Sequence, residues 1–195
     1  MFYTVNIPRP PSELTSLVKD VAYNKPINLK SAEWHSNIQP PETNCAAGLF
    51  FIDEKINRLM QEYFQKFFSD DFISTVGIIH NIKSLTSSYP PHSDKFRRVG
   101  LNYYIDLGGT NVETVFYNNI DDSVESDGGS VLSYNKLCSV SEKIIFEKNK
   151  WYLFHTRKFH SVENIETTRC LLTISFLNID FIPFQKKYKH LLLPL

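Results

Sequence analysis

The sequence contains no long apolar run and no apolar leader at its N-terminus. None of its 195 residues lies in a stretch approaching the about 20 apolar residues that a helix needs to span a bilayer. The first residues, MFYTVNIPRPPSELTSL, carry prolines and charges where a signal peptide needs an apolar segment. These absences predict a soluble, cytoplasmic protein with no membrane partner.

The chain also has no excess of charge of either sign. Twenty-one basic residues balance 21 acidic ones, so the formal net charge is zero. A protein that coats nucleic acid or anionic lipid by charge alone needs a basic excess, so nucleic acid is not an expected partner. A small local groove, for example around KFRRVG, stays compatible with this balance.

Cysteine is scarce, and its spacing fits no paired motif. Cys45, Cys138 and Cys170 are far apart and form no C-x-x-C pattern. Cys170 lies within the apolar run RCLLTISF, which predicts a reduced thiol in the core. An odd number of cysteines without a secretory signal fits a reducing compartment.

The length and a hydrophobic content of 42% predict one globular domain spanning 1–195. We expect a helical support region over 1–73, a catalytic core over 74–181 and a tail over 182–195. Within the first region, PSELTSLVKDVAYN and DEKINRLMQEYFQKFFSDD place apolar residues at helical spacing, and Ser12 is a candidate N-cap. Both patterns predict helices that pack on the outside of a sheet.

Beyond about Ser74 the pattern changes to short β-branched and aromatic runs. These runs are STVGIIHNI, VGLNYYIDL, ETVFYNN, SVLSYN, KIIFE, WYLFH and RCLLTISFL, separated by turn sequences such as LGGTN, SDGGS and EKNK. About eight evenly spaced strands predict an antiparallel sandwich or barrel.

One short segment carries a pattern typical of metal ligands. In YPPHSD, which we interpret as turn-rich, His92 and Asp94 are separated by a single residue. Side chains two positions apart on a strand point to the same face, so both could meet one ion. The pair alone is equally compatible with an ordinary polar surface, and a metal site needs a third ligand.

The segment WYLFHTRKFHSVENIETTRC offers two candidates for that ligand, His155 and His160. Arg169 stands nine residues after His160, at the head of an apolar strand. Burying an arginine is costly unless an anion meets it, and its planar fork suits a carboxylate. Two imidazoles and a carboxylate leave open positions on Fe(II), the arrangement of non-haem oxygenases. Zinc accepts the same ligands, but a hydrolytic zinc site gives no reason for the arginine.

The ordered set of motifs resembles the Fe(II)- and 2-oxoglutarate-dependent dioxygenases, and most of all their prolyl-hydroxylase-like branch. HSD at His92, the following YY strand, HSV at His160 and TR at Arg169 carry the resemblance, which covers about Tyr89 to Phe176. It implies a mainly β fold with flanking helices around a double-stranded β-helix (jelly-roll, cupin-like) core. The chain departs from the family's GGET run, having GGTNVETVFY instead.

The resemblance also implies roles for individual residues. His92, Asp94 and His160 would bind Fe(II) and form the catalytic centre, and Arg169 would pair with the distal carboxylate of 2-oxoglutarate. The resemblance also implies that Tyr104, Thr173 and Tyr89 contact the cosubstrate. Arg97 or Arg98 would lie at the mouth, and the sequence does not say which of them contacts substrate.

The implied reaction consumes O2 and 2-oxoglutarate and hydroxylates an unactivated C–H bond. Related halogenases have a small residue in place of the carboxylate, so Asp94 favours hydroxylation. The substrate would be a prolyl or other side chain of a peptide or protein, or a small molecule. Two alternatives stay open: a non-catalytic jelly-roll module that binds a structural metal, and a nucleobase oxygenase of the same chemistry.

Overall fold

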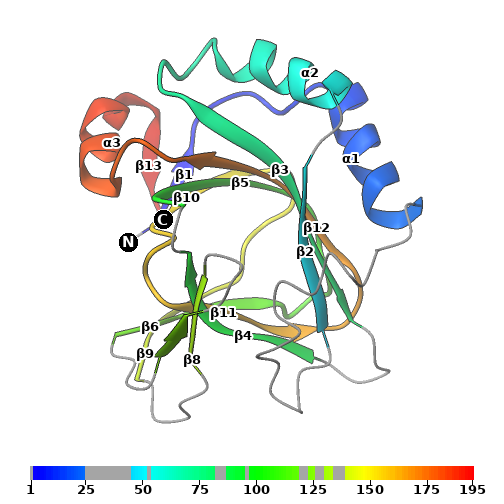
Figure 1. Cartoon of the computed structure of the whole chain (residues 1–195), viewed down its shortest axis with the longest axis vertical. Coiled ribbons are helices and arrows are strands. Elements are labelled where there is room, and N and C mark those ends of the chain that lie inside the picture. The colour runs from blue at the N-terminus through cyan, green and yellow to red at the C-terminus, as the bar shows by residue number, and fades with distance from the viewer. Residues whose placement is uncertain are drawn as a thin grey trace.

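The computed structural model describes residues 2–24, 45–51, 54–81, 87–94, 97–118, 123–125, 130–133 and 139–195. Within these residues the strands form two antiparallel sheets that face each other as two layers (Figure 1). The larger sheet has the order β13 (Leu192–Pro194), β1 (Phe2–Val5), β10 (Trp151–Phe154), β5 (Val99–Leu107), β12 (Arg169–Phe176), β3 (Phe72–Asn81) and β2 (Cys45–Phe51). The smaller sheet has the order β7 (Ser123–Glu125), β8 (Ser130–Ser133), β4 (Ser87–Asp94), β11 (His160–Ile165), β6 (Glu113–Tyr117) and β9 (Val140–Ile144).

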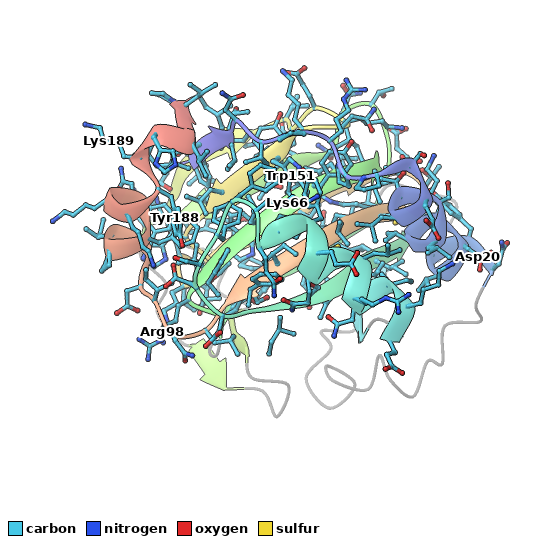
Figure 2. The ribbon with its side chains drawn as sticks, turned by 90° about the horizontal axis from the view of Figure 1, so that it is seen from above. Asp20, Lys66, Arg98, Trp151, Tyr188 and Lys189 are labelled. Atoms are coloured by element: carbon cyan, nitrogen blue, oxygen red, sulfur yellow. The ribbon has the colours of Figure 1, made fainter. Side chains whose placement is uncertain are left out.

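Two helices cover the outer face of the larger sheet. Helix α1 (Ser12–Asn24) and helix α2 (Glu54–Phe64) lie on the side away from the smaller sheet (Figure 1). Their apolar faces, with Leu14 and Met60 fully buried, join the main hydrophobic core. Trp151 of β10 lies next to α2 in the view from above, and its ring packs edge-on against Phe64 at 5.0 Å (Figure 2). The predicted helices on the outside of a sheet are confirmed.

Successive side chains of β12 point alternately into the core and into the space between the sheets. Cys170 and the alternate residues that follow it belong to the core under the helices. Arg169 and Thr173 have the opposite parity, and the contacts of Arg169 reach β6 of the smaller sheet. The space between the sheets, called the interior below, is therefore lined partly by polar side chains.

The terminal regions contribute strands as well as helices. β1 pairs with β10 and with β13, which brings the two ends of the chain side by side (Figure 1). Helix α3 (Phe181–Lys187) and a 3-10 turn (Lys189–Leu191) precede β13. The segment 1–73 that we expected to be a helical support thus also supplies β1 and β2 to the larger sheet, and the expected tail is ordered structure.

The segment around YPPHSD differs most from the sequence interpretation. It is the strand β4 rather than a turn-rich segment, with His92 opposite His160 and Tyr89 opposite Val162 of β11. Three steps along β4 thus match two along β11, so β4 carries an extra residue where its two prolines lie. Proline has no N–H to donate to a ladder, and a bulge is a place where a strand tolerates it.

Two smaller points complete the fold. The sequence predicted a strand at KIIFE, which begins at Lys143. The observed strand β9 lies earlier in the chain, from Val140 to Ile144. None of the helices among the described residues is long and apolar enough to cross a membrane.

Candidate active site

Two histidines from neighbouring strands meet in the interior. His92 on β4 and His160 on β11 are Cα partners in the ladder, and their ring centroids lie 4.3 Å apart. His160 is buried between the rings of Phe116 and Phe154, at 5.6 and 5.5 Å. The strand pairing therefore brings together two imidazoles that are far apart in the sequence.

The hydrogen bonds of His160 fix its tautomer. Its Nδ1 lies 2.8 Å from the backbone carbonyl of Lys158, which can only accept, so Nδ1 carries the proton. Burial, together with the charges of Arg97 and Arg169, lowers the pKa of His160 to about 4. At neutral pH the ring is uncharged and Nε2 keeps a lone pair, the form in which histidine binds a metal.

Asp94 lies on the same face of β4 as His92, as the spacing predicts. Its Oδ2 is 3.4 Å from Nη1 of Arg97, and its backbone N–H donates to the carbonyl of Thr156. Within the described ranges, no three His, Cys, Asp or Glu side chains are grouped to hold a metal ion. The structure thus brings His92 and His160 together, while the carboxylate of Asp94 faces a guanidinium.

Arg97 points into the interior and occupies a pocket shaped for it. Its Nη2 donates to Asn102 Oδ1 at 2.9 Å and to Thr173 Oγ1 at 2.5 Å. A β-carbon on Gly100 would come within 2.5 Å of the same Nη2, so only glycine leaves room for this side chain. Thr156 donates its hydroxyl to the Arg97 carbonyl and fixes the backbone.

Arg98 takes the opposite direction. It lies at the periphery of the molecule (Figure 2) and pairs with Asp180 at 3.3 Å, with 40% of its side chain exposed. The sequence left open which of the two arginines faces the site. The structure places Arg97 inside and Arg98 outside.

Arg169 is the second buried arginine of the interior. Only 3% of the residue is exposed, its guanidinium lies over the ring of Tyr104 at 4.8 Å, and Nη2 reaches Thr114 Oγ1 at 3.4 Å. Its Nε has no hydrogen-bond partner, and within the described residues no carboxylate pairs with it. A buried cation with unmet donors is costly, so this position suits an anionic ligand.

The remaining expected cosubstrate contacts lie against Arg169, Arg97 and His92 in turn. Tyr104 is fully buried beneath Arg169, whereas Thr173 hydrogen-bonds to Asn102 and Arg97. The ring of Tyr89 stands edge-on to His92, with centroids 4.7 Å apart. All three residues border the same interior as the histidine pair.

His155, the competing histidine, lies elsewhere. Its ring stacks on Phe181 of α3 at 5.0 Å, and burial lowers its pKa. Of the two candidates, only His160 faces His92.

Sequence reasoning missed the polar pocket around Arg97. Asn102 and Gly100 alternate with the apolar residues of VGLNYYIDL and so occupy its inner face, a pattern visible in the sequence. Thr114, which contacts Arg169, belongs to the departure from the GGET run. Two polar or small residues on the inner face of a buried strand were the available signal.

No protein-family model matches the sequence, and no curated protein matches it at a significant level. Solved structures do match. A prolyl hydroxylase from Trichoplax adhaerens, solved in complex with a peptide fragment of the hypoxia inducible factor oxygen degradation domain, superposes with a TM-score of 0.52 at 14% identity, over 97% of this chain and 86% of that one. The chain has a jelly-roll fold. The expected fold class is confirmed.

Other jelly-roll proteins are similar at a lower level. A Pseudomonas putida prolyl-4-hydroxylase gives a TM-score of 0.40 at 12% identity, over 85% of this chain and 99% of that one. An oxalate oxidase solved with glycolate gives 0.38 at 8% identity, over 72% and 54%.

The side chains of the interior combine nitrogen and oxygen donors with a buried cation. His160 keeps its Nε2 lone pair clear of the Lys158 contact, its ring lies 4.3 Å from that of His92, and Asp94 shares a strand face with His92. The buried, partly unpaired donors of Arg169 suit the carboxylate of an organic acid. His92, Asp94 and His160 would hold the metal, and Arg169 would hold the acid.

Proposed function

We propose that the protein is a non-haem Fe(II) oxygenase that couples the oxidative decarboxylation of 2-oxoglutarate to hydroxylation of a C–H bond. The observation that carries this proposal is the pairing of His92 and His160 across β4 and β11, in an interior that also buries Arg169. Fe(II), 2-oxoglutarate and O2 together supply the oxidising chemistry, and the protein supplies the geometry.

Two groups of the chain's own residues would carry separate tasks. The Nδ1–H of His160 is held by the Lys158 carbonyl, which keeps Nε2 oriented and unprotonated. Arg169 would bind the distal carboxylate of the cosubstrate, with Tyr104 beneath its guanidinium. Apolar rings around His160 keep water away from the reacting centre.

A side chain of a peptide or protein, such as proline, is the substrate class we favour. The prolyl-hydroxylase-like order of the motifs supports this choice, and a small molecule is the alternative within the same chemistry. Asp94 provides a carboxylate where a halogenase has a small residue, which favours hydroxylation over halogenation.

The test is an anaerobic titration of Fe(II) into the purified protein with 2-oxoglutarate. We expect a visible metal-to-ligand charge-transfer band that is lost in Asp94→Ala and needs more 2-oxoglutarate in Arg169→Ala. A charge-assisted pair contributes about 1.5–3 kcal/mol, so the affinity for 2-oxoglutarate should fall at least about tenfold. Arg98→Ala is the matched control, because Arg98 lies outside the interior.

The same experiment separates the alternative function. A non-catalytic jelly-roll module would hold zinc or no metal, and 2-oxoglutarate would produce no band. An unchanged affinity for 2-oxoglutarate in Arg169→Ala would show that Arg169 does not bind the cosubstrate. The similarity to the oxygenases would then be one of fold alone.

A further inference from the structure

Arg97 puts a positive charge beside the carboxylate that the proposed function assigns to a metal. Its Nη1 lies 3.4 Å from Asp94 Oδ2, with 13% of the Arg97 side chain and 17% of the Asp94 side chain exposed. A metal that binds Asp94 therefore meets a resident cation that already holds the same group.

The position of Arg97 is built into the surrounding strands. Asn102 and Thr173, which are Cα partners on β5 and β12, both accept hydrogen bonds from its Nη2. Gly100 leaves the space that the guanidinium fills, and Phe154 lies 5.5 Å from its central carbon. Because neighbours from three strands surround the guanidinium, these contacts hold the Arg97 side chain in its inward conformation, close to Asp94.

The charges of the interior do not balance without a ligand. The guanidiniums of Arg97 and Arg169 both enter the interior, and within the described residues Asp94 is the one carboxylate that contacts either of them. Like charges in a poorly hydrated space repel strongly. A divalent cation alone increases this excess of positive charge, whereas an anionic ligand reduces it.

We propose that Arg97 is an internal counter-cation of Asp94 that competes with the metal, keeps the metal affinity of the ligand-free protein low, and couples metal binding to binding of the acidic cosubstrate. The inference rests on the proposed metal site and goes beyond it by assigning Arg97 a positioning and regulatory role. Arg97 touches Asp94 and acts through it.

A different role for Arg97 would have the opposite effect on metal binding. A group that hydrogen-bonds to a metal ligand and orients it strengthens metal binding, so its removal weakens binding. The distance of 3.4 Å between Arg97 Nη1 and Asp94 Oδ2 is long for a hydrogen bond, so the orienting effect is weak. The repulsion between the guanidinium and a metal ion is doubled when the ion carries two charges. Repulsion is therefore the larger effect, and removal of Arg97 should strengthen metal binding.

The experiment measures binding of Mn2+ alone, a redox-inert probe, to the metal-free full-length protein by calorimetry. We expect Arg97→Met to bind Mn2+ at least about tenfold more tightly than the unmodified protein, because a buried positive charge has been removed. Arg97→Lys keeps the charge and should stay near the unmodified value. Arg98→Met is the matched control and should change nothing, since Arg98 pairs with Asp180 at the surface.

Two further readouts separate the charge effect from a merely structural one. Saturating 2-oxoglutarate should raise the Mn2+ affinity of the unmodified protein by a larger factor than that of Arg97→Met. The rise in Tm on adding Mn2+ should also be larger in Arg97→Met, where Asp94 lacks its partner. Arg97→Gln, which keeps a polar side chain near Asn102 and Thr173, replaces Arg97→Met if the latter does not fold.

The outcomes distinguish this inference from the proposed function. Mn2+ binding that requires Asp94, tested with Asp94→Asn, but is unchanged or weaker in the Arg97 variants would overturn the role of Arg97 alone. If the unmodified protein binds no Mn2+ with or without 2-oxoglutarate, the proposed metal site fails and this inference fails with it.

Discussion

Gly100 and Arg97 are in such close contact that a β-carbon on Gly100 would lie 2.5 Å from Arg97 Nη2. The same β-carbon would lie 2.5 Å from the methyl carbon of Thr156, which is fully buried. The backbone of β5 therefore forms one wall of the guanidinium pocket, and the identity of residue 100 is linked to the charge beside Asp94.

We expect Gly100→Ala to lower the free energy of unfolding by about 1–3 kcal/mol, the usual cost of overpacking a tight site. Urea denaturation measures it. Gly77→Ala on β3 is the control, because the atoms nearest to its β-carbon would belong to the flexible side chain of Leu171, at 3.1 Å. Equal losses in the two variants would contradict a special role for Gly100.

His160 and His155 provide a matched pair for testing the histidine assignment. His160→Ala should abolish the charge-transfer band and the consumption of 2-oxoglutarate, because it removes the imidazole that faces His92. His155→Ala should keep both, since His155 stacks on Phe181 outside the interior. Circular dichroism checks that both variants are folded. Full consumption of 2-oxoglutarate by His160→Ala would contradict the assignment of His160 as a metal ligand.

The reactivity of Cys170 offers a test of the core. Burial raises the pKa of its thiol to about 12, and the nearby charge of Asp106 adds to this effect. The reactive thiolate is therefore absent at pH 8, and the fully buried sulfur is inaccessible. Iodoacetamide should leave Cys170 unmodified in the folded protein and alkylate it in urea, as mass spectrometry of its peptide would show. Alkylation at equal rates in both conditions would mean that the core opens readily.

The sequence predicted those features that depend on regular alternation. The antiparallel sandwich, the two helices on the outside of the sheet and the buried thiol of Cys170 are confirmed. A His-x-Asp spacing places two side chains on one face of any strand, so the common orientation of His92 and Asp94 needed no tertiary information. The spacing along the chain could not place His160 opposite His92, because this partnership depends on the pairing of β4 with β11.

The course of β4 and the directions of Arg97 and Arg98 could not be predicted, because side chains do not alternate regularly at a bulge or in a connection. The bulge in β4 falls at two prolines that locally indicate a turn, and only pairing on both sides makes this segment a strand. Arg97 and Arg98 precede β5 in a connection, where no periodicity says which points inward. Their directions are set by tertiary partners: Asn102 and Thr173 for Arg97, and Asp180 for Arg98.

The attachment of α3 gives a prediction for stability against pH. Asp70 Oδ2 accepts hydrogen bonds from Tyr188 OH at 2.5 Å and from Lys187 Nζ at 2.9 Å, joining the end of α3 to the connection between α2 and β3. Burial alone would raise the pKa of Asp70, but these hydrogen bonds and the charge of Lys187 outweigh it and lower the pKa. The ionised carboxylate is thus the form that stabilises the fold.

Asp70→Asn should therefore lower the free energy of unfolding by about 1 kcal/mol at pH 7, a modest value because the pair is partly exposed. A carboxyl group whose pKa is lower in the folded state stabilises above its unfolded value of about 3.9, and this contribution is lost as pH falls through the folded value. The difference between the unmodified protein and Asp70→Asn should shrink below about pH 4 in urea titrations repeated from pH 7 downwards. Asp71→Asn is the control, since Asp71 is exposed and its change should cost little at any pH. A difference that stays constant down to pH 2 would show that the pairing of Asp70 does not depend on its charge.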